Sequence, residues 1–317
     1  MIIQTLLVII GFVCLIFGAN WLVDGASALA KKYKISDLAI GLTIVAFGTS
    51  APELVVNIIG SINGYSDIVL GNIVGSNNFN LFIILGISGL ILPITVQSTT
   101  AWKEIPISLL VTIILLFFIN DFQFSEPSFL SRVDSFIMLV LFVLFLYYVF
   151  RQMKNDPSIH ADFVPKSTLK IWGLVLIGLT GLIMGGQFVV FNSVKIANSL
   201  GISEKIIGLT IVAAGTSLPE LVTSIVAATK RNSDIAIGNV IGSNIFNILF
   251  ILSISGMVMP IEYNPKFNLD FYILIGGTVF LLISMLTGQR KKLDRWEAGT
   301  LLGFYLLYTI YLVMKEI

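Results

Sequence analysis

The stretch "GTSAPELVVNI", residues 48–58, decides the fold of this chain. It lies inside a long apolar run, yet it holds a glycine, two hydroxyl side chains, a proline and an ionisable glutamate. Pro52 has no backbone N–H to donate and its ring clashes with the preceding turn, so a helix through this stretch must break. Freed backbone groups at membrane depth are tolerated only where they line a cavity or are buried in protein. The stretch therefore predicts a broken membrane helix whose loosened carbonyl groups help to form an ion site.

The composition of the whole chain supports a membrane setting. Of the 317 residues, 56% are hydrophobic and 12% are charged, whereas a soluble domain carries roughly 25% charged residues. Apolar runs recur from end to end, each long enough to cross a hydrocarbon core of ~30 Å. The net charge of +1 gives no field that would attract nucleic acid, and the single cysteine, Cys14, excludes an intramolecular disulfide. We expect an all-α, multi-pass membrane protein with the lipid bilayer as its surroundings.

The motif occurs twice because the chain is an internal repeat. Aligned at an offset of 167 residues, positions 40–94 and 207–261 are identical at 32 of 55 positions. The identities include polar residues of the motif, which recurs as "GTSLPELVTSI" at 215–225, so shared hydrophobicity cannot explain them. We predict two five-helix repeats and a cytoplasmic linker, with boundaries 1–152, 153–166 and 167–317.

Five spans in each repeat is an odd number, so the second repeat must enter the membrane from the opposite side, as in secondary transporters with inverted repeats. We expect the ten spans near residues 3–29, 36–62, 67–92, 103–120, 131–151, 168–199, 204–229, 234–260, 269–287 and 296–314. With the N-terminus outside, 14 of the 19 Lys and Arg residues fall on the cytoplasmic side and 5 fall outside. The positive-inside rule therefore places both termini outside an inner or plasma membrane.

The glutamate of each motif has two interpretations. Ser50-x-x-Glu53 matches a capping box and Pro52 suits the first turn of a helix, so Glu53 could cap the half-helix that follows. An ionised carboxylate near the bilayer centre costs at least ~2.5 kcal/mol, and a serine cap alone would avoid that cost. Inversion also brings Glu53 and Glu220 to a similar depth. We therefore predict that both glutamates are ion ligands, a role that is compatible with capping.

A second element occurs twice, as "GNIVGSNNFN" at 71–80 and "GNVIGSNIFN" at 238–247. Asn80 and Asn247 fall near the centres of their spans, at the depth of the glutamates. Ser76 and Ser243 lie one helical turn earlier and share a face with them. The glycines of this element are interpreted as helix-packing residues. The two amides need polar partners in a dry core, so we assign them to the site.

The combined donor set consists of oxygen atoms only. It contains two carboxylates, two amides and the hydroxyl groups of Thr49, Ser50, Thr216 and Ser217. The only histidine, His160, lies in the linker and is expected to be solvated. Hard oxygen ligands suit Ca²⁺ or Na⁺ and do not suit copper or zinc.

These paired motifs resemble the alpha repeats of the sodium/calcium exchangers, of prokaryotic type, within the cation/calcium antiporter superfamily. The resemblance implies a Na⁺/Ca²⁺ antiporter without cofactor, enzymatic activity or obligate protein partner. It also implies alternating access, in which the first and sixth helices slide against a core of helices 2, 3, 7 and 8. Exchange of three Na⁺ for one Ca²⁺, which the resemblance also implies, would be electrogenic.

The resemblance assigns roles to individual positions. Ca²⁺ would be bound by the side chains of Glu53 and Glu220 with the carbonyl groups of Thr49 and Thr216. An outer Na⁺ site would use Ala213, Thr216, Ser217, Glu220 and Ser243. The matching inner Na⁺ site would use Ala46, Thr49, Ser50, Glu53 and Ser76. Asn80 and Asn247 would line the region between them, and because potassium-dependent relatives carry aspartate at the position of Asn247, the chain is expected to be K⁺-independent.

Other functions remain as alternatives with less support. A Ca²⁺/H⁺ antiporter could use the same two glutamates, since buried carboxylates can take up protons. The Thr and Ser sets beside each glutamate favour Na⁺, because a proton does not need them. An intramembrane protease would need a nucleophile–base pair or two aspartates deep in the membrane, and the only histidine is in the linker while the aspartates of the predicted spans lie toward their ends. A channel is less consistent with inverted broken helices, which are typical of alternating access.

Overall fold

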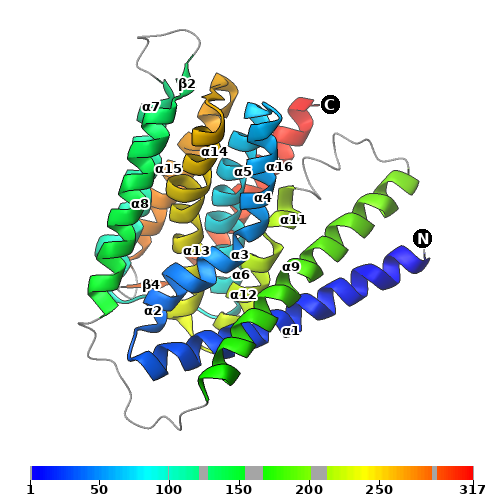
Figure 1. Cartoon of the computed structure of the whole chain (residues 1–317), viewed down its shortest axis with the longest axis vertical. Helices are drawn as coiled ribbons and strands as arrows, with labels where there is room; N and C mark the ends of the chain where they lie inside the picture. Colours follow the sequence, from blue (N-terminus) through cyan, green and yellow to red (C-terminus); the bar gives the residue numbers. More distant parts are fainter. Residues whose placement is uncertain are drawn as a thin grey trace.

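The computed structural model describes residues 2–98, 100–120, 128–153, 167–200, 213–287 and 291–316 (Figure 1). These residues are almost entirely helical, which confirms the all-α part of the predicted fold class. The few strands are two residues long and form two antiparallel pairs. The first pair joins β1, Ile94–Thr95, to β4, Lys292–Leu293. The second joins β2, Phe129–Leu130, to β3, Ile261–Glu262.

The first half of the chain contains five helical segments, several of them interrupted by short π-helices. Their parts are α1 Ile2–Tyr33; α2 Asp37–Ile40, η1 Gly41–Val45, α3 Ala46–Thr49 and α4 Ala51–Ile62; α5 Ser66–Asn78, η2 Phe79–Ile84 and α6 Leu85–Ile91; η3 Thr100–Glu104 and α7 Ile105–Asn120; and α8 Arg132–Met153. A π-turn inside an α-helix often marks a functional site.

The second half repeats this order. Its parts are α9 Thr168–Ser199; α11 Ala213–Thr216 and α12 Leu218–Thr229; α13 Ser233–Phe246, η6 Asn247–Leu252 and α14 Ser253–Val258; η7 Pro265–Phe267 and α15 Asn268–Ser284; and α16 Arg295–Glu316. Residues 204–212 of the predicted seventh span and residues 154–166 of the predicted linker lie outside the described residues.

Within the described ranges, seven helices are long and apolar enough to cross a membrane. The segments Asp37–Thr49 and Ala51–Ile62, which meet at a bend of 49°, form an eighth candidate. The break predicted at the first motif is therefore present, and a matching interruption separates α11 from α12. The chain is a multi-pass membrane protein, whereas the count of ten spans and their inversion stay predictions.

The centre of the molecule is formed by the segments α5–α6 and α13–α14 (Figure 1). In the most apolar window of Ser233–Val258, 94% of the residues are buried, compared with 22% in the window of α1. Small residues let α13 pack closely on η1 as well: a Cβ at Gly242 would lie 2.9 Å from the Leu42 Cα. The two copies of the second predicted element meet in this interior, where the Asn77 and Asn244 side chains each bond the backbone of the other residue.

Helices α1 and α9 lie side by side and cross the other helices at a slant (Figure 1). Their backbones approach closely because glycines face each other. A Cβ at Gly178 would lie 2.6 Å from the Leu22 N and 2.8 Å from the Gly18 O. This is the small-residue packing by which membrane helices associate.

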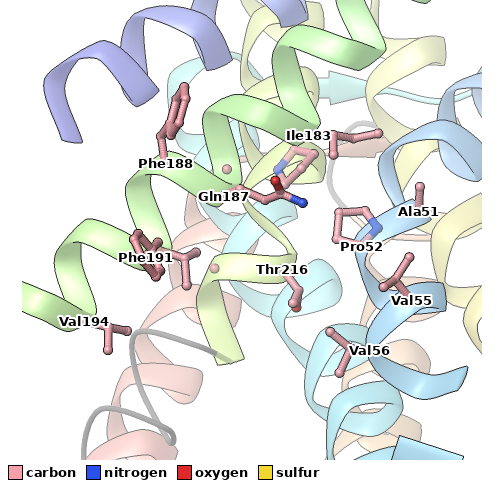
Figure 2. A pocket seen from close by; sticks show the side chains of 14 residues that line it. Ala51, Pro52, Val55, Val56, Ile183, Gln187, Phe188, Phe191, Val194 and Thr216 are labelled. Atoms are coloured by element: carbon pink, nitrogen blue, oxygen red, sulfur yellow. The ribbon is translucent and has the colours of Figure 1, made fainter. Parts of the chain in front are cut away.

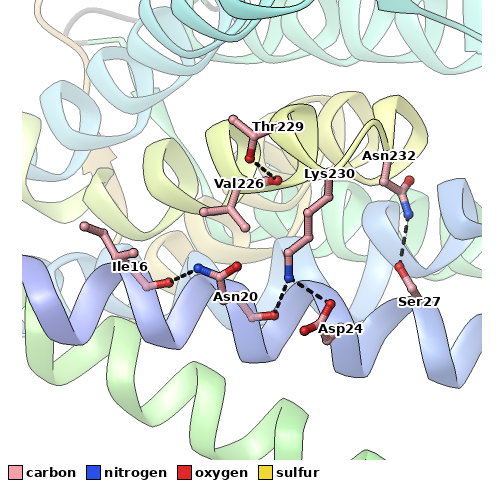
Figure 3. Close-up of polar contacts among 8 residues, drawn as sticks. All are labelled: Ile16, Asn20, Asp24, Ser27, Val226, Thr229, Lys230 and Asn232. Carbon is pink, nitrogen blue, oxygen red and sulfur yellow. Dashed lines mark hydrogen bonds and ion pairs between the residues drawn. The ribbon is translucent and has the colours of Figure 1, made fainter.

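A polar tether joins α1 to the turn between α12 and α13 (Figure 3). The Lys230 Nζ donates to the Asn20 carbonyl at 3.1 Å and forms an ion pair of 2.8 Å with Asp24. The Asn232 amide donates to the Ser27 hydroxyl at 3.0 Å. Exposed ion pairs contribute little free energy, about 0–1 kcal/mol, so this tether adds only a weak link to the α1–α9 pair.

The glycine contact gives a first prediction. Gly178→Ala should lower the melting temperature of the detergent-purified protein, because the new Cβ meets the backbone of α1. Gly173→Ala in the same helix is the matched control, since a Cβ there has no described neighbour within 4 Å. Alanine is the better helix former by about 1 kcal/mol, so the control should be as stable as the parent or more stable. Equal melting temperatures for the two variants would contradict close backbone packing.

Candidate functional site

Each helix break places a glutamate at the start of a half-helix. Ser50 (φ −82°, ψ 11°) separates α3 from α4, and Ser217 (φ −89°, ψ 9°) precedes α12. A proline in the first turn follows each serine, which is compatible with helix initiation because that turn needs fewer backbone donors. Neither serine caps the half-helix that follows it in the described structure. Both serine side chains are therefore directed elsewhere.

Each serine instead contacts the glutamate of the other half. The Ser50 Oγ donates to the Glu220 Oε1 at 2.8 Å, and the Ser217 Oγ donates to the Glu53 Oε1 at 3.1 Å. Both glutamates are 1% exposed. The two bonds are exchanged at the repeat offset, so the two breaks face each other across the interior. The carboxylates predicted from the sequence are brought together at one buried site.

The second oxygen of each carboxylate is free to accept another partner. Among the described residues, neither the Glu53 Oε2 nor the Glu220 Oε2 has a hydrogen-bond donor. A buried carboxylate without sufficient compensation is costly. The site therefore has two oxygen atoms available for a bound cation.

The predicted serines of the second element behave differently in the two halves. The Ser76 Oγ lies 3.4 Å from the Glu53 Oε1 and 3.2 Å from the Ser217 Oγ, so it is within hydrogen-bond distance of both. The Ser243 side chain is also buried, but its Oγ has no partner within the part of the chain that the structure describes. The structure thus joins Ser76 to the glutamate pair and leaves Ser243 without a bond to Glu220.

The predicted threonines are held by two asparagines that the sequence interpretation did not assign to the site. The Thr49 Oγ1 donates to the Asn239 Oδ1 at 3.1 Å, and the Thr216 Oγ1 donates to the Asn72 Oδ1 at 3.5 Å. The Asn239 Nδ2 also donates to the Glu220 carbonyl at 3.2 Å. The sequence did contain a sign of this role, because Asn72 and Asn239 are identical polar residues at matching positions of the two repeats.

The predicted amides Asn80 and Asn247 are both 1% exposed and lie where η2 and η6 begin. The Asn80 Nδ2 donates to the Asn244 Oδ1 at 3.0 Å, and the Asn247 Nδ2 donates to the Asn77 Oδ1 at 2.9 Å. Across the described ranges, neither side-chain oxygen of Asn80 or Asn247 has a donor. Asn77 and Asn244 were missed as site residues, although they too match between the repeats.

The two predicted alanines can contribute only backbone groups. Ala46 is buried, and its carbonyl accepts a bond from the Ser50 N at 3.0 Å, while the Thr49 Oγ1, which donates to Asn239, lies 3.3 Å from it. This carbonyl is engaged in the structure, so a cation there would share it. Ala213 begins α11, and its side chain lies outside the described part of the chain.

A cavity of about 670 Å³ borders both breaks (Figure 2). It lies between α9, α4 and the α11–α12 segment, and most of its lining is apolar. Pro52 and Pro219, which each adjoin a site glutamate, are part of the wall. Gln187 of α9 points toward Pro52 and gives the wall a polar side chain (Figure 2). Thr216, one of the predicted site residues, is also part of the lining, so the cavity reaches the edge of the site.

The donor chemistry favours hard cations. In the described chain there is no group of three or more His, Cys, Asp or Glu residues that could hold a metal ion. Two carboxylates surrounded by hydroxyl, amide and carbonyl oxygen atoms suit Na⁺ or Ca²⁺, which bind oxygen ligands.

Comparisons with known proteins agree with this chemistry. The family model described as sodium/calcium exchanger protein matches residues 3–151 and 170–314. A chain from Alkalimonas amylolytica with the provisional name antiporter CaxA is 36% identical, covering 97% of this chain and 98% of that one. The sodium/calcium exchanger MaX1 of Methanosarcina acetivorans is 32% identical, with 97% of each chain covered. A solved structure of the sodium-calcium exchanger NCX_Mj, soaked with zero Na⁺ and Ca²⁺, is 31% identical with a TM-score of 0.84, covering 98% of this chain and 99% of that one.

The buried oxygen cage gives a second prediction. Ca²⁺ should raise the melting temperature of the purified parent, because a ligand that binds only the folded state adds about 2.7 kcal/mol at 100 times its Kd. Glu53→Gln and Glu220→Gln should each abolish this increase. Glu262→Gln, which changes an exposed carboxylate of β3, is the matched control and should respond as the parent does. A full Ca²⁺ response in either site variant would remove that glutamate from the cation site.

Proposed function

The chain belongs to the sodium/calcium exchanger protein family, and we propose that it exchanges Na⁺ for Ca²⁺ across a cell membrane by alternating access. The observation that carries the proposal is the pair of buried glutamates, each bonded to the serine of the other half and each with one oxygen that has no donor among the described residues. Family membership supports the choice of ions, and the oxygen-only donor set is compatible with both.

The charge of the site explains how the two ions become coupled. Two ionised carboxylates give the empty site a charge of −2. One Ca²⁺ neutralises this charge, and so do two Na⁺, whereas a third Na⁺ leaves +1. Ca²⁺ and a full load of Na⁺ therefore compete for Glu53 and Glu220, so that each turnover carries one or the other. An empty site with charge −2 resists movement through a low dielectric, which limits leakage.

The individual ligands are proposed in two overlapping sets. Ca²⁺ binds the glutamates with the carbonyl groups of Thr49 and Thr216. One Na⁺ site uses Ala213, Thr216, Ser217, Glu220 and Ser243, and the other uses Ala46, Thr49, Ser50, Glu53 and Ser76. Asn80 and Asn247 line the region between them. Their side-chain oxygen atoms, which are buried and have no donor in the described part of the chain, support this role.

The proposed topology has ten membrane helices in two inverted repeats. The repeats span residues 1–152 and 167–317, the linker 153–166 is cytoplasmic, and both termini lie outside. The exchanged hydrogen bonds at the repeat offset support a two-fold relation between the halves. The α1–α9 pair is the moving part, and its small buried share relative to α13 supports motion over a fixed core.

Coupling to Na⁺, without a requirement for K⁺, is favoured over coupling to protons. The hydroxyl groups of Ser50 and Ser217 contact the carboxylates directly and provide oxygen atoms that a proton would not need. No third carboxylate is available at position 247, where asparagine stands.

A transport assay tests the proposed ion coupling. Vesicles loaded with Na⁺ should take up ⁴⁵Ca²⁺ in K⁺-free choline buffer, and an imposed pH gradient alone should not drive uptake. Glu53→Gln and Glu220→Gln should each abolish uptake, because Ca²⁺ would be left under-neutralised in a low dielectric. Glu262→Gln should transport normally. Uptake driven by pH and indifferent to Na⁺ would identify a Ca²⁺/H⁺ antiporter, and a requirement for K⁺ would overturn the two-carboxylate argument.

The proposed stoichiometry predicts a dependence on voltage. If three Na⁺ leave for each Ca²⁺ that enters, one net positive charge leaves per cycle, and the potential contributes ~2.3 kcal/mol per 100 mV. Uptake driven by internal Na⁺ should accelerate when valinomycin and a K⁺ gradient make the vesicle interior positive. Rates that do not change with the clamped potential would exclude an electrogenic cycle.

A further inference from the structure

We propose that Asn77 and Asn244 are positioning residues that fix which end of the Asn80 and Asn247 amides faces the cation site. The inference rests on the proposed function, because it explains how the same site presents oxygen atoms to Na⁺ and Ca²⁺. The sequence gives no direct sign of this role, since all four residues are asparagines in the same short motif.

The observation is a reciprocal pair of bonds between α5 and α13. The Asn77 Nδ2 donates to the Asn244 carbonyl at 3.2 Å, and the Asn244 Nδ2 donates to the Asn77 carbonyl at 3.3 Å. Asn77 is 0% exposed and Asn244 is 2% exposed. The side-chain nitrogen of each residue thus donates to the backbone carbonyl of its counterpart in the other half.

These backbone contacts determine the orientation of the whole network. A backbone carbonyl can only accept, so the nitrogen end of the Asn77 amide must face Asn244 and its oxygen must face away. The Asn77 Oδ1 can in turn only accept, so Asn247 must present its Nδ2, as the 2.9 Å bond requires. In the same way the Asn244 Oδ1 can only accept, so Asn80 must present its Nδ2, which donates to it at 3.0 Å.

In both the Asn80 and the Asn247 amide, the nitrogen is held by this network and the oxygen is the atom without a hydrogen-bond partner among the described residues. The Asn80 Oδ1 and the Asn247 Oδ1 are buried without a donor among the described residues. A cation supplies the partner that these acceptors lack. If either amide turned over, an NH₂ group would face the cation and repel it, and two oxygen atoms would oppose each other inside the network.

The network also constrains the residue type at position 247. An aspartate there has no donor for the Asn77 Oδ1 when it is ionised, so Asn77 would have to turn. Its oxygen would then face the Asn244 carbonyl, which places two acceptors opposite each other. Asn77 and Asn244 therefore favour amides, and disfavour carboxylates, at Asn80 and Asn247.

A purely structural role is the competing explanation, because the same bonds also hold α5 against α13. Asn78 provides a matched control for this role. It is the next residue of α5, it is 1% exposed, and its Nδ2 donates to the Asp270 carbonyl of α15 at 3.1 Å. Asn78→Leu removes a buried bond between helices without removing a partner of Asn80 or Asn247.

The experiment measures the half-saturating Ca²⁺ concentration and the maximal rate of Na⁺-driven uptake in proteoliposomes. Asn77→Leu should raise the half-saturating concentration at least about tenfold, which corresponds to about 1.4 kcal/mol. Asn77→Ser, which introduces no large apolar group, should shift it in the same direction and keeps the test available if the leucine variant does not fold. Asn78→Leu should leave the half-saturating concentration near that of the parent, even where its melting temperature falls.

A double-mutant cycle completes the test. Because Asn77 acts through Asn247, Asn77→Leu/Asn247→Leu should bind Ca²⁺ no more weakly than Asn247→Leu alone. If the double variant shows the product of the two single shifts in half-saturating Ca²⁺ concentration, or if Asn78→Leu shifts this concentration as much as Asn77→Leu does, Asn77 has a packing role. Either result would overturn the inference while the parent still exchanges. A parent that neither binds nor transports Ca²⁺ would overturn both the inference and the proposed function.

Discussion

The central constraint on this protein is the burial of two carboxylates in a membrane interior. Glu53 and Glu220 are almost completely shielded, and each receives a hydrogen bond from the serine of the opposite half. Hydroxyl donors stabilise a carboxylate without neutralising its charge, so the arrangement retains its affinity for cations. Broken helices, small residues and buried amides can all be understood as the means by which the fold provides oxygen ligands at a depth where water does not.

Each of the two repeats supplies one glutamate and one serine to this arrangement from the same motif. The hydrogen bonds that cross between the halves come in pairs, in which equivalent residues of the two repeats donate to equivalent acceptors. The paired donors are Ser50 and Ser217, Thr49 and Thr216, and Asn77 and Asn244. Reciprocal contacts of this kind are also found across the two-fold axis of symmetric dimers, and they support the proposed inversion of the two halves. Within the described residues the relation is incomplete, because the Ser76 Oγ lies 3.4 Å from the Glu53 Oε1 whereas the Ser243 Oγ has no hydrogen-bond partner. The two glutamates therefore have different surroundings there.

The packing of the outer helices is compatible with movement around a fixed centre. Segments α5–α6 and α13–α14 bury most of their surface and carry the amide network, whereas α1 and α9 pack mainly against each other. Glycine contacts such as that between Gly178 and the backbone of α1 hold the pair together. The contact of Lys230 with Asp24 is an exposed ion pair, which costs little to break. A pair that is joined more tightly within itself than to its surroundings can shift as a unit.

The sequence by itself determined the membrane class, the repeat, the break at Pro52 and the identity of the two glutamates. These features follow from local rules, because proline interrupts a helix wherever it stands and an ionisable residue in an apolar span needs a function. Only the tertiary structure decided that each serine serves the opposite glutamate, and that Asn72 and Asn239 hold the threonines. It also decided that Asn77 and Asn244 control the direction of the Asn80 and Asn247 amides. The two asparagines that each copy of the motif contributes are equivalent in sequence, and they acquire different roles only when α5 packs on α13, because an amide is oriented by the donors and acceptors that face it.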